Sequence, residues 1–316
     1  MSTFLDHLLN GLLLGGIFAL IAVGYSLVYG IIKLINFAHG EVAMFGAFFA
    51  FFIFSMFDVD GDLKDHPWIY VLAMVVSIFV TMGLGWLLEF LAYRPLRKAS
   101  RLSALITAIG ASLLLQYLAA VIWSPSVVSF EAPEVFYYEL FSVMDGDVLF
   151  EVKHLVVFML VSFCLTLLWW VVEKTRMGKA MRACSQDADA AALMGININR
   201  VVAFTFIFGS AMAALSGVLY GLHLEQVRYN MGIQIGIVAF AAAVLGGIGS
   251  IPGAVLGGFV IGFTQAMASG YLSDLGDFIG HPLNSGYTEA VAFMIMILCL
   301  IVKPNGLLGK GDADRA

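Results

Sequence analysis

The chain has 316 residues, of which 61% are hydrophobic and 12% charged, and its mean hydropathy is +0.95. Water-soluble globular domains average roughly 45–50% apolar and about 25% charged residues, so this composition excludes them and predicts a polytopic membrane protein. The formal charge of −6, from 16 basic and 22 acidic side chains, also excludes a basic nucleic-acid-binding surface. The expected fold class is an all-α bundle of about eight or nine transmembrane helices.

Uncharged runs in the sequence predict where these helices lie, because about 20 apolar residues are needed to cross roughly 30 Å of hydrocarbon. In chain order the runs are 8–32, 42–57, 68–88, 102–130, 154–172, 201–224, 229–273 and 290–302. The 45-residue run 229–273 would be about 67 Å long as one helix, so it must turn back on itself. If both of its arms cross the membrane there are about nine crossings, and if one arm is re-entrant there are about eight.

Basic residues predict the orientation of the chain. Twelve of the 16 lie in three segments, 94–101, 174–200 and the tail from Lys303. The positive-inside rule places such segments in the cytosol. The segments 58–65 and 131–151 are rich in acidic residues and would face outward. We therefore expect the C-terminus in the cytosol and the N-terminus outside.

Polar residues open the second apolar run. Asn36, His39, Gly40 and Glu41 follow Lys33 closely. Asn36 has the identity of a helix N-cap, which would place His39 in the first turn and Glu41 near the positive end of the helix dipole. Polar groups beside a span often line a pathway. A cap at the cytosolic interface, with Glu41 paired to Lys33, is the other reading, and the two are compatible.

A glycine-rich break interrupts the long run between residues 246 and 253. Its candidate path-lining residues are Gly246, Gly247, Gly249 and Gly253. A broken helix is tolerated in the membrane where protein or a watery cavity satisfies the backbone, so the break fits either a pathway or a tight cytosolic turn. The run from residue 36 and the run from residue 232 would cross in opposite directions, as an inverted repeat requires.

The basic segment 174–200 is rich in helix formers and carries Gly195 as a helix stop, which predicts a short cytosolic helix. Small and apolar side chains such as Ala180, Ala190, Ala191 and Met194 would give this helix a contact surface. The composition therefore favours a docking element over a plain linker.

Several blocks of the sequence resemble known importers. Asp189-Ala-Ala, with Gly195 after it, resembles the Glu-Ala-Ala-x-x-x-Gly coupling motif of ABC-importer permeases, although Asp replaces Glu and the downstream Ile-x-Leu-Pro is missing. The blocks 24–31 with 35–41, 93–97, 176–183 and 243–254, in that order along the chain, are similar to the branched-chain amino acid permease family of LivH type.

The resemblance implies one permease domain over residues 1–316 that contains a coupling segment at 174–200. Its implied partners are a second permease of LivM type, two cytosolic ATP-binding subunits and an extracytoplasmic binding protein, in a bacterial inner membrane. The implied substrate is leucine, isoleucine or valine, although similar systems import urea, amides or other amino acids. The residues expected to couple to the ATPase are Arg176, Gly178, Ala180, Arg182, Asp187, Asp189, Ala190, Ala191 and Gly195.

Enzymatic and ion-coupled functions compete with this interpretation. The sequence has no Gly-x-x-x-x-Gly-Lys-Ser/Thr loop, so ATP would be bound by the partners, and we expect this chain to hold no cofactor or metal and to have no catalytic residues. An ion-coupled secondary transporter would need carboxylates near the membrane midplane. Glu41, Glu89 and Glu289 are all expected at the margins of spans, which gives that class little support.

Overall fold

The structure is a computed structural model that describes residues 2–57, 66–97, 99–143, 148–279 and 285–309. Within these residues seven helices are long and apolar enough to cross a membrane, which confirms the expected all-α polytopic class. They are α1 (Ser2–Ile32), α2 (His39–Phe57), α3 (Pro67–Leu88) with its π-helical extension η2 (Glu89–Tyr93), α4 (Arg101–Ile122), α5 (Val152–Lys174), α8 (Ile198–Leu224) and α10 (Ile251–Ile279). Two shorter apolar helices are α9 (Met231–Gly246) and α11 (Thr288–Val302).

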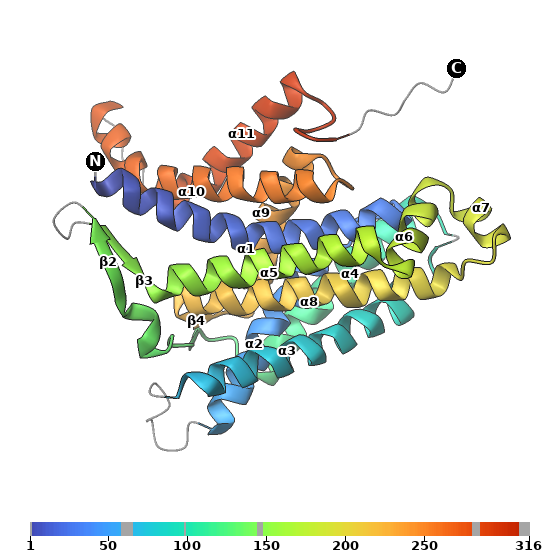
Figure 1. Cartoon of the computed structure of the whole chain (residues 1–316), viewed down its shortest axis with the longest axis horizontal. Helices are drawn as coiled ribbons and strands as arrows, with labels where there is room; N and C mark the ends of the chain where they lie inside the picture. The colour runs from blue at the N-terminus through green and yellow to red at the C-terminus, as the bar shows by residue number, and fades with distance from the viewer. Residues whose placement is uncertain (1, 58–65, 98, 144–147, 280–284, 310–316) are drawn as a thin grey trace.

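The bundle has two chemically different ends (Figure 1). At one end lie α6 (Arg176–Gln186), α7 (Ala188–Leu193) and the basic turn 94–97. Arg97 donates a hydrogen bond of 2.6 Å to Asn199, which ties that turn to the start of α8. We call this the basic end. The opposite end carries the acidic hairpin of β2 (Glu139–Val143) and β3 (Val148–Glu151), and we call it the hairpin end. The other acidic segment, 58–65, lies outside the described residues.

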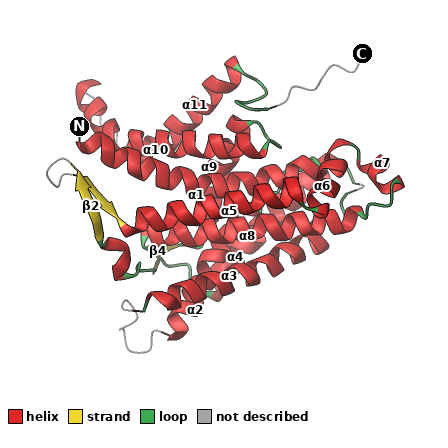
Figure 2. Ribbon diagram, viewed as in Figure 1, coloured by secondary structure: helices red, strands yellow, loops and turns green. Residues whose placement is uncertain are grey.

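Short elements complete the chain at and near the hairpin end (Figure 2). β1 (Val128–Ser129) pairs antiparallel with β4 (Gln226–Val227), so the loop after α4 and the loop after α8 are joined. Two 3-10 turns, η3 (Glu134–Tyr137) and η4 (Ser285–Tyr287), precede β2 and α11.

The helix contacts repeat in the two halves of the chain. In this comparison α1 corresponds to α8, α2 to α9 and α3 to α10. The contact of α1 with α10 then matches that of α8 with α3, and the contact of α2 with α8 matches that of α9 with α1. The pattern extends to α4, which packs against α2 as α11 packs against α9. Because α1 runs toward the basic end and α8 runs away from it (Figure 1), the two halves have opposite directions. The arrangement is therefore that of an inverted repeat, formed by α1–α4 and α8–α11.

Glycines allow the central helices to approach at backbone distance. A Cβ atom at Gly258 of α10 would lie 2.5 Å from the Cα and the nitrogen of Ala19 in α1. The same helix pair brings Gly15 against Gly258, and α2 meets α8 where a Cβ at Gly46 would lie 2.5 Å from the Cα of Ala214. Small residues at such crossings permit the close van der Waals packing that holds membrane helices together.

We expect Gly258→Ala to lower the thermal stability of the purified protein in detergent, by about 1–3 kcal/mol, because the new methyl group overlaps the α1 backbone. Gly110→Ala is the matched control, since a Cβ at Gly110 of α4 meets nothing within 4 Å. The control should be neutral or stabilising by up to about 1 kcal/mol, because alanine favours helix more than glycine does. Equal melting shifts for the two variants would contradict this account of the α1–α10 crossing.

Candidate functional site

Two helices, α2 and α9, begin inside the bundle rather than at one of its ends. The His39 ring at the start of α2 packs against Gly24 and Gly209, which lie eight residues before the end of α1 and eleven after the start of α8. At 1.5 Å per residue these positions are about 12 and 17 Å from the basic end, roughly halfway through the hydrocarbon. α9 begins at a similar depth, because Gly232 and Gly236 pack against Gly40.

Non-helical segments reach these helix starts from opposite ends of the bundle. Residues 33–38 lead inward from the end of α1, and residues 225–230 lead inward from the end of α8. Such backbone survives at membrane depth only where protein buries it and supplies hydrogen bonds. Asn36 is 2% exposed and Ala38 fully buried, and the second segment pairs through β4 with β1. The bundle therefore contains two broken crossings, each made of a non-helical segment followed by a helix, and they enter from opposite ends of the bundle.

Glu41 lies where the two helix starts meet. It belongs to the first turn of α2, and its carboxylate packs so closely on Gly232, in the first turn of α9, that a side chain there would overlap it. Its Oε1 accepts a hydrogen bond of 3.4 Å from Ser112, halfway along α4. Its Oε2 has no hydrogen-bond partner, although the residue is only 1% exposed.

The electrostatics of this place come from helix ends. Among the described residues no basic side chain forms an ion pair with Glu41. The N-terminus of a helix carries about half a positive charge, and two such ends converge on the carboxylate. α9 in particular has no side-chain cap of its own. Glu41 can therefore serve as a negative group shared by the starts of α2 and α9.

Aromatic groups close the junction on the α1 side. The Tyr25 ring lies 4.9 Å from the His39 ring in an edge-on contact and 5.9 Å from Phe240 of α9. The Nε2 atom of His39 is buried without a hydrogen-bond partner. We refer to Tyr25, His39, Glu41, Ser112 and Gly232 as the polar junction.

Two sequence expectations for this region are wrong. Lys33 does not pair with Glu41; it is exposed, and its Nζ lies 5.7 Å above the Tyr29 ring. Asn36 does not cap α2 with its side chain, because α2 begins only at His39 and the Asn36 Oδ1 accepts a hydrogen bond of 2.7 Å from Tyr93. Both errors have one cause, which is that the non-helical segment 33–38 carries the chain inward before α2 begins, so that Glu41 lies at mid-depth and not at a margin of the bundle.

The glycine-rich break at 246–250 is a tight turn at the basic end. Gly247 and Gly249 have φ angles of +104° and +91°, which favour glycine. The Ser250 side chain then caps α10 by accepting from the Gly253 N–H at 3.2 Å. This geometry matches the turn reading, and the break in the bundle lies instead at the start of α9. A contribution of Gly246, Gly247, Gly249 and Gly253 to a path stays a prediction.

The coupling segment forms two helices where the sequence predicts one. Asp187 ends α6 and caps α7, since its side chain accepts from the Ala190 N–H at 2.9 Å. Gly195 ends α7 with φ +84°. Arg182 is anchored, because it donates to the Val172 carbonyl and lies 3.3 Å from Glu173.

The tip of this segment is apolar and projects from the bundle. Leu193 and Met194 are 90% and 83% exposed, whereas Ala191 beside them is buried. Of the other expected coupling residues, Gly178 packs on the end of α5, and Arg176, Asp189 and Ala190 are exposed on α6 and α7. The composition of the segment predicted a contact surface that includes Met194, but it did not single out Leu193 beside it.

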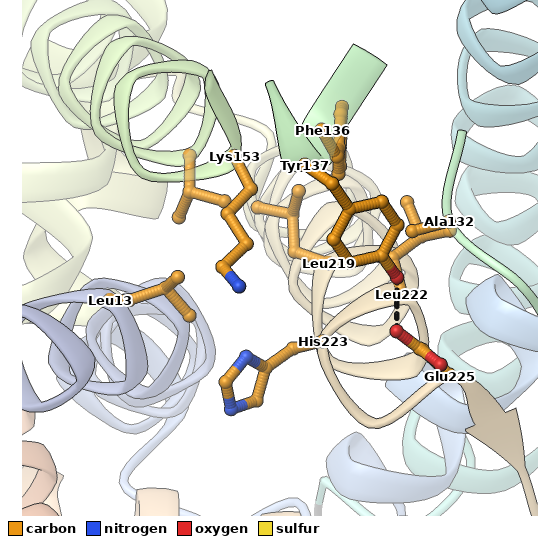
Figure 3. A pocket seen from close by; sticks show the side chains of 10 residues that line it. Leu13, Ala132, Phe136, Tyr137, Lys153, Leu219, Leu222, His223 and Glu225 are labelled. Carbon is orange, nitrogen blue, oxygen red and sulfur yellow. Dashed lines mark hydrogen bonds between the residues drawn. The ribbon is translucent and has the colours of Figure 1, made fainter. Parts of the chain in front are cut away.

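A small pocket of about 80 Å³ lies at the hairpin end between α1, α5 and α8 (Figure 3). Lys153 and His223 point into it, and the Tyr137 hydroxyl donates to the Glu225 carboxylate at its rim. The pKa of Tyr137 is raised above its usual value, mainly by burial and in second place by the hydrogen bond to Glu225. Lys153 is paired with Glu151 at 2.5 Å, so the charges here are largely neutralised. No local sequence pattern indicates this pocket, because its residues come from three separate helices and the loop before β2.

A long all-α bundle with a mid-depth polar junction, two opposed broken crossings and an exposed apolar tip is typical of a membrane transport protein. The family model "Branched-chain amino acid transport system / permease component" matches residues 7–300. The chain belongs to this permease family.

Its relatives are similar along their whole length. The chain is 40% identical to the high-affinity branched-chain amino acid transport system permease protein LivH of Escherichia coli, over 99% of this chain and 97% of that protein. It is also 40% identical to the corresponding protein BraD of Pseudomonas aeruginosa, over 99% and 98%. A probable permease LivH of Methanocaldococcus jannaschii is 28% identical, over 95% and 91%.

We expect Glu41→Gln to lower thermal stability by about 1–2 kcal/mol, because the carboxylate no longer balances two helix dipoles. Glu41→Lys should cost more, about 3–5 kcal/mol, since a buried cation would face two positive helix ends. Melting of the purified protein in detergent measures both effects. Glu289 in the exposed first turn of α11 is the matched control, where both substitutions should cost at most about 1 kcal/mol. Equal losses for Gln and Lys at position 41 would contradict the convergence of the two helix ends.

Proposed function

We propose that this chain is the membrane-spanning permease subunit of an ABC importer for branched-chain amino acids. The observation that carries the proposal is the match of the family model over residues 7–300 together with 40% identity over nearly the full length of two named permeases. Leucine, isoleucine and valine are the proposed substrates, because the relatives are named for branched-chain amino acid transport.

In the proposed importer this chain forms the translocation path and transmits the movement of the ATPase subunits to it. Two partner subunits bind and hydrolyse ATP, so the chain itself holds no cofactor, and a second related permease and an extracytoplasmic binding protein complete the importer. The basic end faces the cytosol, by the positive-inside rule, with the C-terminus on that side. Since α1 begins at the hairpin end and runs toward the basic end, the proposed orientation has the N-terminus outside, in a bacterial inner membrane.

The exposed tip of α7 supports the coupling role. Leu193 and Met194 are large apolar side chains that project into solvent at the basic end, where a groove on an ATPase subunit would cover them. Movement of that subunit on ATP binding would then be transmitted to α8, since the chain runs from Gly195 through the Asn197 cap directly into this helix.

The polar junction is the proposed control point of the path. Its residues His39 and Glu41, together with the adjoining Asn36 and Gly40, lie where two broken crossings of opposite direction meet, which is the arrangement in which transporters place their central sites. In this conformation the junction is closed, since Asn36, His39 and Glu41 are each at most 2% exposed.

Purification of the chain from its native membrane under mild conditions tests the assembly. We expect two P-loop ATPases and a second permease to copurify, and the complex in liposomes to take up [¹⁴C]leucine only with ATP and the binding protein. Uptake of urea or amides instead would change the substrate but keep the importer. A chain that purifies alone and drives uptake with an ion gradient would overturn the proposal in favour of a secondary transporter.

We expect Leu193→Glu combined with Met194→Glu to lower ATP-driven uptake at least about tenfold, because charged side chains cannot enter an apolar groove. The variant should reach the membrane normally, since both side chains are exposed, but should no longer copurify with the ATPases. The control exchanges the two residues, Leu193→Met with Met194→Leu, which keeps the tip apolar and should keep uptake. Normal uptake by the glutamate variant would remove α7 from the ATPase interface.

A further inference from the structure

The turn that joins α3 to α4, residues 93–97, makes two connections that its role as a loop does not require. Arg97 is the first. Its Nη2 donates to the Glu89 carboxylate, and its Nη1 donates to the Asn199 side chain at 2.6 Å. The Glu89 side chain is 2% exposed and that of Arg97 17%, so the ion pair is largely withdrawn from solvent. Burial lowers the pKa of Arg97, and Glu89 opposes that effect.

Tyr93 makes the second connection. Its hydroxyl donates to the Asn36 Oδ1 at 2.7 Å, and both residues are buried. Its ring lies 5.1 Å from Phe206 of α8. Asn36 in turn holds the start of α2, because its carbonyl accepts from the His39 N–H at 3.0 Å. One turn of chain is therefore bonded to α8 on one side and to the start of α2 on the other.

The backbone from Glu89 to Tyr93, just before the turn, is a π-helix. In η2 the Arg94 N–H bonds to the Glu89 carbonyl at 2.7 Å, five residues back. Such a segment costs stability relative to an α-helix and is frequent at functional sites, where it changes which side chains share a face. In η2 the π-helical backbone sets how the Glu89 side chain, which binds Arg97, is oriented relative to the Tyr93 side chain, which binds Asn36.

These contacts form a continuous route from the basic end to the polar junction. It starts at α7, whose end is bonded to the chain entering α8 through the Ile196 N–H and the Ala191 carbonyl at 3.1 Å. Asn199 lies one turn later in the chain, in the first turn of α8. Any displacement of α7 that shifts the start of α8 must therefore stretch, carry along or break the bond to Arg97.

We propose that Arg97, Glu89, Tyr93 and Asn36 form a latch that transmits movement of the α7–α8 corner to the start of α2. This inference rests on the proposed function, since it assigns positioning residues to ATP-driven coupling. Arginine suits the central position because its planar fork bonds two partners at once, which a lysine ammonium cannot reproduce at the same geometry.

The test separates coupling from stability by removing both buried charges together. Removing one charge strands the other and destabilises the protein, whereas replacing both with apolar side chains of similar size is often neutral. We therefore use Glu89→Leu with Arg97→Met, and Asn199→Ala as a milder variant that removes only the bond to α8. Each is assayed in the complete reconstituted complex for melting temperature, ATP hydrolysis and leucine uptake.

The expected result is an intact complex that still hydrolyses ATP but takes up on the order of tenfold less leucine per ATP. Tyr93→Phe, which keeps the ring on Phe206 and loses only the hydroxyl, should shift the same ratio in the same direction. Arg94→Met is the matched control, because Arg94 lies in the same turn but its side chain is exposed and lies 5.4 Å from the centre of the Phe90 ring, away from Asn199 and Asn36 in the bonded route. It should leave uptake per ATP unchanged.

Wild-type uptake per ATP in the double variant would overturn the latch and leave the ion pair a purely structural contact. If the double variant fails to assemble, Asn199→Ala decides, since a normal ratio there overturns the latch and a lowered ratio supports it. Absence of ATP-driven uptake in the wild-type complex would instead remove the proposed function itself, and the latch with it.

Discussion

The structure depends on how two helix N-termini are held in the middle of a bundle that excludes water. The starts of α2 and α9 carry the positive ends of two helix dipoles, and α9 has no side-chain cap from the residue before it. Glu41 places its carboxylate against the start of α9, where its Oε1 accepts a hydrogen bond from Ser112 of α4 and its Oε2 packs on Gly232 without a hydrogen-bond partner. One carboxylate thus fixes the relative position of three helices and of both halves of the repeat.

Close approach of backbones is the condition that makes this arrangement possible. Gly40, Gly232 and Gly236 leave no room for a side chain between α2 and α9, and Gly24 leaves none beside the His39 ring. Larger residues at these positions would push the helix starts apart and expose the carboxylate to an empty, dry gap. The glycines and Glu41 are therefore one structural unit, in which the small residues give the distance and the acid gives the charge.

Much of the helical layout could be predicted from the sequence, because hydrocarbon thickness sets the length of an uncharged run and basic residues gather at one end. The depth of Glu41 could not be predicted, because a run of apolar residues does not reveal that residues 33–38 lead back into the bundle as a non-helical segment after α1. The run 42–57, with 16 residues, was the available signal, being too short to cross alone. The bond between Tyr93 and Asn36 joins residues far apart in sequence, so no local pattern predicts it.

Burial of the polar junction also decides in which conformation Glu41 can cap helices and in which it can line a path. At 1% exposure, packed on Gly232, it touches no transported molecule while α2 and α9 are in contact. Contact with a substrate requires these helices to separate, and separation withdraws the α9 dipole from the carboxylate, which keeps only that of its own helix. Glu41 can therefore cap the helices in one conformation and line a path in another, but it cannot do both at once. A link from the basic end to the start of α2 is what such a change needs, because α2 itself does not reach that end.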